Sequence, residues 1–162
     1  MAAASGAHSW ATTPATRRSM QANRSTGTSP EMAVRRELHR RGLRYRVAAR
    51  PFPALRRTVD LLFPRARVAV EVRGCFWHGC PDHCRLPAAH RDYWEAKVAK
   101  NIERDAATER LLAEGGWTLV VVWEHEPVTE AADLIEATVR KGGCSATWVS
   151  SQAARETCGD NG

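Results

Sequence analysis

Residues 67–84, RVAVEVRGCFWHGCPDHC, place a valine-rich strand pattern directly before a dense group of metal-binding and aromatic side chains. In the first part, Val68, Val70 and Val72 alternate with more varied residues, as in a strand whose two faces meet different surroundings. In residues 74–84 the chain carries three cysteines, two histidines and two large aromatic residues. Soft metal ligands, a candidate general base and stacking aromatics at the end of a strand indicate chemistry on a nucleic acid.

Hydrophobic periodicity and turn residues on either side of this stretch predict alternating helices and strands. A helix is expected to begin with Ser29 as N-cap and Pro30 as its first residue, and to end at Gly42. A second helix is expected to begin at Asp92, with Glu95 completing a capping box, and to run to about residue 112. Strands are expected at residues 43–47, 58–63, 67–73 and 117–123, and a last helix at residues 129–140.

This order of elements predicts an α/β fold with three layers, α/β/α, around a mixed central sheet. Residues 58–63 and 67–73 are expected to form a hairpin, and the apolar strand 117–123 is expected to be central and buried on both faces. The predicted domain covers residues 29–141. It lies between a flexible basic N-terminal arm, residues 1–28, and a disordered tail, residues 142–162.

Composition narrows the class of protein. The chain has 162 residues, enough for one domain with a core, and a formal net charge of +6 that favours a polyanionic partner. It shows no apolar run long enough for a membrane span and no secretory signal. Three of the five cysteines crowd into residues 75–84, which indicates a metal site in a reducing compartment, whereas Cys144 and Cys158 are expected to be free thiols.

The cysteine-rich loop predicts a zinc site. Cys75, Cys80 and His83 supply three ligands of the type that zinc prefers. The fourth ligand is either the adjacent Cys84 or the distant His125, which follows the apolar strand and would fasten the loop to the sheet. The alternative is a set of unrelated buried cysteines.

A second pattern concerns acid–base chemistry. Asp60 lies in a strand, and Glu71 and Arg73 lie on its expected neighbour, as in metal-dependent nucleases where acids hold Mg²⁺ and a basic residue helps to orient water. The alternative is a salt bridge among these three residues. His78 is placed to take a proton from an attacking water, or it has only a structural role.

Aromatic and basic residues predict contacts with nucleic acid. The aromatic side chains either stack on or wedge between bases, or they pack together on the metal loop. The aromatic residues concerned are Phe76, Trp77, Tyr93 and Trp94. The stretch 17–24, which contains Arg17 and Arg18, either becomes an ordered arm on a phosphate backbone or stays a solvated tail.

Longer motifs follow one another along residues 16–128. They are Arg18-Ser19-Met20, Ser29-Pro30-Glu31, residues 43–47, Asp60 on its strand, residues 74–78, Tyr93-Trp94-x-x-Lys97-x-x-x-Asn101-x-Glu103-Arg104-Asp105, and residues 116–125. In this order the motifs resemble the very-short-patch mismatch-repair endonucleases, the Vsr family.

The resemblance implies a restriction-endonuclease-like core with a structural zinc. It implies Mg²⁺-dependent nicking of one DNA strand on the 5′ side of the thymine in a T:G mismatch left by deamination of 5-methylcytosine. Asp60 and the backbone carbonyl of Val72 are then the Mg²⁺ ligands, His78 is the base, and Glu31 is an acid near the active site. The implied zinc ligands are Cys75, Cys80, His83 and His125, and the implied DNA contacts are Arg17, Arg18, Met20, Phe76, Trp77, Trp94, Lys97 and Asn101.

The chain departs from the family pattern at two strand positions. Arg73 stands where the family has a second catalytic histidine, and Glu71 stands where an apolar residue is expected. Arginine cannot act as a base at neutral pH, although it can stabilise phosphate charge. The zinc ligands also differ in type and spacing from the best-known members, which keeps Cys84 open as a replacement for His83.

The leading hypothesis is therefore a monomeric mismatch-repair endonuclease in the cytoplasm, on the nucleoid. Its expected partners are double-stranded DNA with a T:G mismatch, a cytosine-5 methyltransferase system and mismatch-repair proteins. One alternative is a related nicking or restriction-type nuclease of other specificity, because the same fold and site can serve either. Another is a zinc-containing DNA-binding module that has lost catalysis, and Arg73 is the feature that keeps it open.

Overall fold

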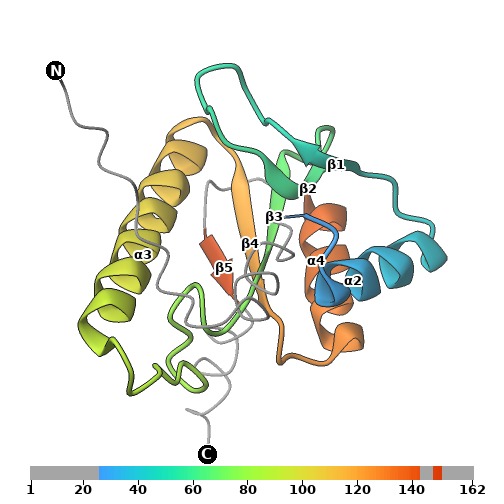
Figure 1. Ribbon diagram of the computed structural model, residues 1–162. Helices are drawn as coiled ribbons and strands as arrows, with labels where there is room; N and C mark the ends of the chain where they lie inside the picture. The colour runs from blue at the N-terminus through green and yellow to red at the C-terminus, as the bar shows by residue number, and fades with distance from the viewer. Residues whose placement is uncertain (1–25, 143–147, 151–162) are drawn as a thin grey trace, which may run out of the picture.

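The computed structural model describes residues 26–142 and 148–150 and has three layers. A five-stranded sheet lies between helix α3 on one face and helices α2 and α4 on the other (Figure 1). The helices are α2 (Ser29–Arg40), α3 (Arg91–Glu114) and α4 (Val128–Lys141), and the strands are β1 (Arg46–Ala49), β2 (Val59–Phe63), β3 (Val68–Arg73), β4 (Thr118–Trp123) and β5 (Trp148–Ser150). Within these ranges no helix is both long and apolar enough to cross a membrane.

The sheet is mixed, as predicted. Its strands lie in the order β1-β2-β3-β4-β5; the pairs β1–β2 and β2–β3 are antiparallel, and the pairs β3–β4 and β4–β5 are parallel. The hairpin of β2 and β3 is confirmed, and every residue of β4 is buried, as expected for a strand covered on both faces. The sequence-based prediction of a three-layer α/β/α fold is therefore confirmed.

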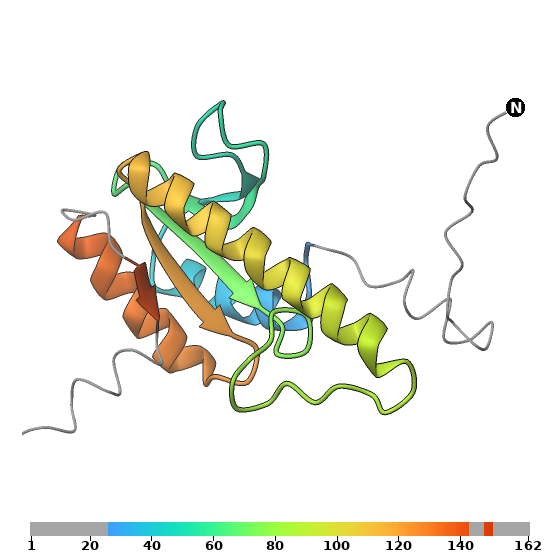
Figure 2. The same ribbon diagram turned by 90° about the vertical axis from the view of Figure 1, so that its left-hand side faces the viewer.

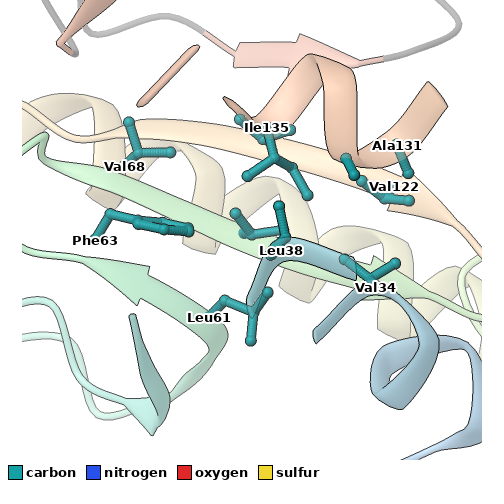
Figure 3. Packing of buried hydrophobic residues seen from close by; sticks show 11 residues of the cluster. Val34, Leu38, Leu61, Phe63, Val68, Val122, Ala131 and Ile135 are labelled. Atoms are coloured by element: carbon teal, nitrogen blue, oxygen red, sulfur yellow. The ribbon is translucent and has the colours of Figure 1, made fainter. Parts of the chain in front are cut away.

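The alternation in β3 divides the core between the two faces of the sheet. Val68 and Val70 pack with Leu38 of α2 and Ile135 of α4 in one buried cluster, part of which is shown in Figure 3. Ala69 belongs to a second cluster on the opposite face, together with residues of β4 and Leu112 of α3. The next two residues of that second face are Glu71 and Arg73, so the apolar face of β3 ends in charged residues.

The helix starts differ from the sequence-based expectation. Thr28, not Ser29, is the N-cap of α2: its backbone is extended, and its hydroxyl oxygen accepts a hydrogen bond from the Glu31 N–H at 3.4 Å. Helix α3 begins at Arg91 after His90, whose φ of 56° is left-handed, so Asp92 lies inside the first turn and does not cap it. The predicted N-cap was wrong by one residue for α2 and by two residues for α3. Which residue caps a helix depends on backbone angles that the amino-acid sequence alone does not specify.

The strands also differ in places. The first strand is shifted from the expected 43–47 to Arg46–Ala49. Strand β5 lies within residues 142–162, where only a tail was expected. Its three residues have no periodic signal, but they pair with the outer edge of β4 and so satisfy backbone groups that an apolar edge strand would leave exposed. Cys144, Cys158, Arg17, Arg18 and Met20 lie outside the described residues.

Candidate active site

The predicted catalytic residues of β2 and β3 lie at one end of the sheet. Strand β2 runs antiparallel to β3, so Asp60, near the start of β2, lies at the same end as Val72 and Arg73, which end β3. The loop of residues 74–90 leaves β3 at this end, and the parallel strand β4 also ends there (Figure 2). Antiparallel pairing therefore brings together residues that are separated in the sequence.

Asp60 is a half-buried carboxylate that accepts a hydrogen bond from the protein backbone. Its Oδ2 accepts a hydrogen bond from the backbone N–H of Val72 at 2.7 Å. Burial raises the pKa of Asp60 to about 6, and the negative charges of Glu31 and Glu71 also raise it, whereas the Val72 N–H and His78 lower it. The raised pKa of Asp60 thus comes first from burial, and the two neighbouring carboxylates add to it.

Glu31 adds a second incompletely compensated acid. Its side chain is buried, and its Oε2 accepts a hydrogen bond from the N–H of Gly27 at 2.5 Å. Its other oxygen, Oε1, is buried without a hydrogen-bond partner among the described residues, and the nearest cation, Arg35 Nη1, lies 3.6 Å away. The carboxylate oxygens of Glu31 and Asp60 are ligands of the kind that a hard divalent cation such as Mg²⁺ prefers.

His78 is held by an acid on helix α3. Its Nδ1 lies 2.6 Å from Oδ2 of Asp105. Burial would raise the pKa of Asp105, but the hydrogen bond and charge of His78, with smaller contributions from Arg73 and Arg104, hold that pKa below its ordinary value. Asp105 therefore remains a carboxylate that can accept a hydrogen bond from the imidazole and fix its orientation.

Asp105 was not among the predicted site residues, although it lies in one of the quoted motifs. It is separated from His78 by 27 positions along the chain, and only the packing of α3 beside the end of β3 brings them together. The signal available in the sequence was an acidic residue on a helix otherwise packed against the sheet, and that signal alone does not name its partner.

Arg73 is buried, with a side chain that is 8% exposed, and it lies among carboxylates. Its Nη2 donates to Glu71 and to Glu109 of α3, each at 2.8 Å, and its Nε lies 4.0 Å from Asp105. Burial opposes the charge, but these carboxylates raise the pKa of Arg73 above its ordinary value. The sequence left open a salt bridge among Asp60, Glu71 and Arg73. Of these, Glu71 and Arg73 form an ion pair, and Glu109 is the second carboxylate that accepts a hydrogen bond from Arg73.

The four candidate zinc ligands converge. The ligand atoms of Cys75, Cys80, His83 and His125 all lie within 4.8 Å of one another. Nδ1 of His125 is 3.0 Å from Sγ of Cys75 and 3.8 Å from Sγ of Cys80, and Nδ1 of His83 is 3.7 Å from Sγ of Cys80. Cys84 lies outside this group, with its Sγ 3.8 Å from the carbonyl oxygen of Phe76.

These four residues fit a tetrahedral zinc ion. Zinc–sulfur and zinc–nitrogen bonds of about 2.3 and 2.0 Å place neighbouring ligand atoms roughly 3.5 Å apart. Burial, followed by the neighbouring Cys80, raises the pKa of Cys75 to about 12, so the thiolate needs a cation to compensate its charge. The loop is further fastened where the Cys75 N–H donates to Glu124, next to His125, at 2.7 Å.

The aromatic residues form one cluster at the loop and the start of α3. Phe76 contacts Trp77 and Trp94 with ring centroids 5.0 and 5.4 Å apart, and Tyr93 contacts Trp94 at 5.2 Å. On α3, Asn101 donates to the carbonyl oxygen of Trp77 at 2.9 Å, and Lys97 Nζ lies 5.8 Å from the Tyr93 ring centroid. The rings thus pack on one another, and Tyr93 is also exposed to solvent.

Known proteins resemble this chain over most of its length. The family model described as "DNA mismatch endonuclease Vsr" matches residues 10–86. The chain is 41% identical over 124 residues to "Type II nicking enzyme V.NaeI" of Lentzea aerocolonigenes, covering 75% of each protein. It is 44% identical over 110 residues to "Type II nicking enzyme V.XorIIP" of Xanthomonas oryzae pv. oryzae, covering 66% of this chain and 77% of that relative. It is 33% identical over 110 residues to "DNA mismatch endonuclease Vsr" of Escherichia coli, covering 66% and 67%. With its restriction-endonuclease-like fold, the chain belongs to the Vsr family and is a DNA endonuclease, a hydrolase of phosphodiester bonds.

Proposed function

We propose that this endonuclease nicks one strand of double-stranded DNA on the 5′ side of the thymine in a T:G mismatch, with Mg²⁺ as its catalytic cofactor. The reaction would start very-short-patch repair of deaminated 5-methylcytosine. The single observation that carries the proposal is that the His78–Asp105 pair lies at the same end of the sheet as Asp60, near enough for His78 to lower the pKa of Asp60. The name of the E. coli relative, a mismatch endonuclease, supports this substrate.

The residues at Asp60 fit the cofactor. Asp60 and the backbone carbonyl of Val72 would hold Mg²⁺, and the orphan Oε1 of Glu31 would contribute negative charge to the same region. When bound, Mg²⁺ supplies positive charge that stabilises the phosphate in the transition state.

His78 would act as the general base. Asp105 accepts the hydrogen bond from Nδ1, which leaves Nε2 to take a proton from the water that attacks the phosphorus. The negative charge of Asp105 then stabilises the imidazolium that forms. The burial of Arg73 among carboxylates leaves His78 as the proton acceptor of this site.

Replacement of the base tests this assignment. We expect His78→Ala to lower the single-turnover nicking rate on a T:G duplex by roughly 10²- to 10⁴-fold, because the attacking water loses its proton acceptor. Asp105→Asn should lower the rate less, because its amide keeps part of the contact but not the charge. Affinity for DNA, measured by fluorescence anisotropy, should stay near the wild-type value. An unchanged nicking rate for His78→Ala would assign the base to another group.

The pH dependence follows from Asp60. Its pKa of about 6 means that the carboxyl is protonated below that pH and cannot then hold a cation, so nicking should rise as pH increases through about 6. Protons and Mg²⁺ compete for the same carboxylate, so a higher Mg²⁺ concentration should move the midpoint to lower pH. Rate profiles at two Mg²⁺ concentrations measure this shift. If the pH midpoint were the same at both Mg²⁺ concentrations, a group other than Asp60 would control the rate.

We infer that the cysteine and histidine cluster binds a structural zinc ion. A Zn²⁺ ion bound by Cys75, Cys80, His83 and His125 would fasten the loop that carries His78 to the end of β4. The same loop carries Phe76 and Trp77, which, with Trp94, would wedge beside the mismatched pair. Lys97 and Asn101 remain predicted DNA contacts, and a cytosine-5 methyltransferase system remains the expected partner.

A strand-specific nicking assay tests the proposed substrate. The assay compares a T:G duplex in several methylation-site contexts with the matched C:G duplex, each with Mg²⁺ present. Nicking confined to the strand with the mismatched thymine supports the proposal. Cleavage of both duplexes would favour a nicking enzyme of other specificity, an alternative supported by relatives named as type II nicking enzymes. Mismatch binding without cleavage would favour the DNA-binding module.

A further inference from the structure

We propose that Arg73 is a positioning residue: its buried guanidinium ties the end of β3 to α3 and thereby holds Asp105, and through it His78, in the reactive geometry. The proposal rests on the proposed nicking function and deepens it. It assigns to Arg73 a role that differs from both a base and a direct phosphate contact.

The contacts of Arg73 span two elements. On its own strand it binds Oε2 of Glu71 through Nε at 3.1 Å and Nη2 at 2.8 Å. Across the gap to α3, the same Nη2 binds Oε1 of Glu109 at 2.8 Å. Its Nε lies 4.0 Å from Oδ2 of Asp105, which is the oxygen that contacts His78.

The spacing on α3 explains why one guanidinium can act on both acids. Asp105 and Glu109 are four residues apart in a continuous helix, so they lie on successive turns of one face. Arg73 anchors that face at Glu109 and lies beside it at Asp105. Because His78 follows Arg73 by only five residues, both members of the His78–Asp105 pair are placed relative to Arg73.

The charges around Arg73 also favour a positioning role. Glu71, Glu109 and Asp105 are three carboxylates around one buried cation, and without that cation they would repel one another. Arginine suits this place because its planar fork binds two carboxylates at once and keeps its charge at any working pH. Two of its three nitrogen atoms already donate to carboxylates, which favours a structural use of the charge over contact with a DNA phosphate.

Single-turnover nicking by Arg73→Gln tests the proposal. We expect the rate at saturating T:G duplex to fall about 10- to 100-fold, as for other partners that orient active-site groups, with DNA affinity unchanged. Arg73→Lys should recover part of the rate, because a lysine can bind one of the two carboxylates. A loss that falls on DNA affinity instead would overturn the proposal in favour of a phosphate contact, and an unchanged rate would overturn it outright.

Arg57 provides the matched control. Its Nη1 donates to the Arg104 carbonyl oxygen and to the Thr108 hydroxyl, both at 2.7 Å, so it also fastens α3. It does so through neutral groups next to Asp105 and Glu109. Arg57→Gln should therefore leave the nicking rate near wild type. An equal loss in both variants would show that any loosening of α3 is sufficient, and would overturn the specific role of Arg73.

A double-variant comparison shows whether Arg73 acts through Asp105. In the Asp105→Asn background, Arg73→Gln should lower the rate little further, because the carboxylate that it positions is already gone. Fully multiplicative losses would contradict the proposal. If Arg73→Gln folds poorly, Glu109→Gln is the substitute, because it removes the contact of Arg73 with α3 at a more exposed side chain. We expect Glu109→Gln to lower the nicking rate as well.

A measurement without DNA separates this inference from the proposed function. In NMR spectra of imidazole-labelled protein, assigned with His78→Gln, the Nδ1 proton of His78 should be protected in the wild type and in Arg57→Gln. It should broaden or be lost in Arg73→Gln. If the proton is protected in the wild type and lost in Arg73→Gln, but the wild type nicks no T:G duplex, the proposed substrate fails while the role of Arg73 stands. An unchanged signal in Arg73→Gln would overturn that role whatever the substrate.

Discussion

The Asp60→Asn variant is expected to lose nicking activity by on the order of 10³-fold or more, and to be at least as stable as the wild type. The loss follows because Asp60 is the carboxylate that we propose to hold Mg²⁺, and charge stabilisation by a metal ion contributes several kcal/mol to such reactions. Asparagine keeps the shape of the side chain and removes the negative charge. Single-turnover rates on a T:G duplex measure the effect.

The stability of this variant follows from the pKa of Asp60. That pKa rises from 3.8 in its ordinary state to about 6 in the folded protein, so the folded protein holds this proton more tightly than the unfolded chain. The stability linked to the protonated carboxyl is fully present below about pH 3.8 and is lost as pH rises through about 6. At pH 7.5 the ionised Asp60 therefore costs roughly 1–3 kcal/mol, which Asp60→Asn should recover in unfolding by urea.

Thermal unfolding with and without Mg²⁺ is the control for the expected loss of activity and gain of stability in Asp60→Asn. Mg²⁺ should raise the melting temperature of the wild type, because an ion that binds only the folded protein stabilises it. It should not do so for Asp60→Asn. Near-normal nicking by the variant would reject Asp60 as the metal carboxylate. A variant that is inactive but also much less stable would mean that Asp60 serves the fold instead of the chemistry.

The Cys75→Ser variant is expected to lose bound zinc and most of its folding stability. Structural zinc contributes apparent free energies of about 10–16 kcal/mol in small zinc domains, which is comparable to the whole stability of an ordinary domain. The loss should be smaller here because two apolar clusters also support the fold. We still expect several kcal/mol in urea unfolding, together with a fall from about one zinc per chain by atomic absorption.

Cys84 is the matched control for this second experiment. It lies in the same loop, but its Sγ approaches the carbonyl oxygen of Phe76 and stays outside the ligand cluster. Cys84→Ser should keep the zinc and nearly all of the stability. Equal losses in the two cysteine variants would place Cys84 among the ligands, and unchanged zinc content in Cys75→Ser would reject the site.

Local patterns were sufficient for much of the architecture. The alternation in residues 68–73 and the apolar run in β4 predicted a hairpin strand and a central strand, because side-chain periodicity is a local property of the chain. The helix ends and β5 were less predictable. A cap depends on the backbone angles of Thr28 and His90, and β5 depends on an open edge of β4 that no local pattern reveals.

The functional residues, like the fold, were predictable in part from local sequence patterns. The sequence by itself determined the fold class, the family and a list of candidate residues that included Asp60, His78 and three candidate zinc ligands, because these lie in short motifs, and it left the fourth zinc ligand open between Cys84 and His125. Only the tertiary structure decided their partners: Asp105 for His78, and Glu109 for Arg73. Both partners come from helix α3, whose approach to the end of β3 is set by packing over the whole sheet. Contacts between distant segments arise from that packing, and no short stretch of sequence encodes them.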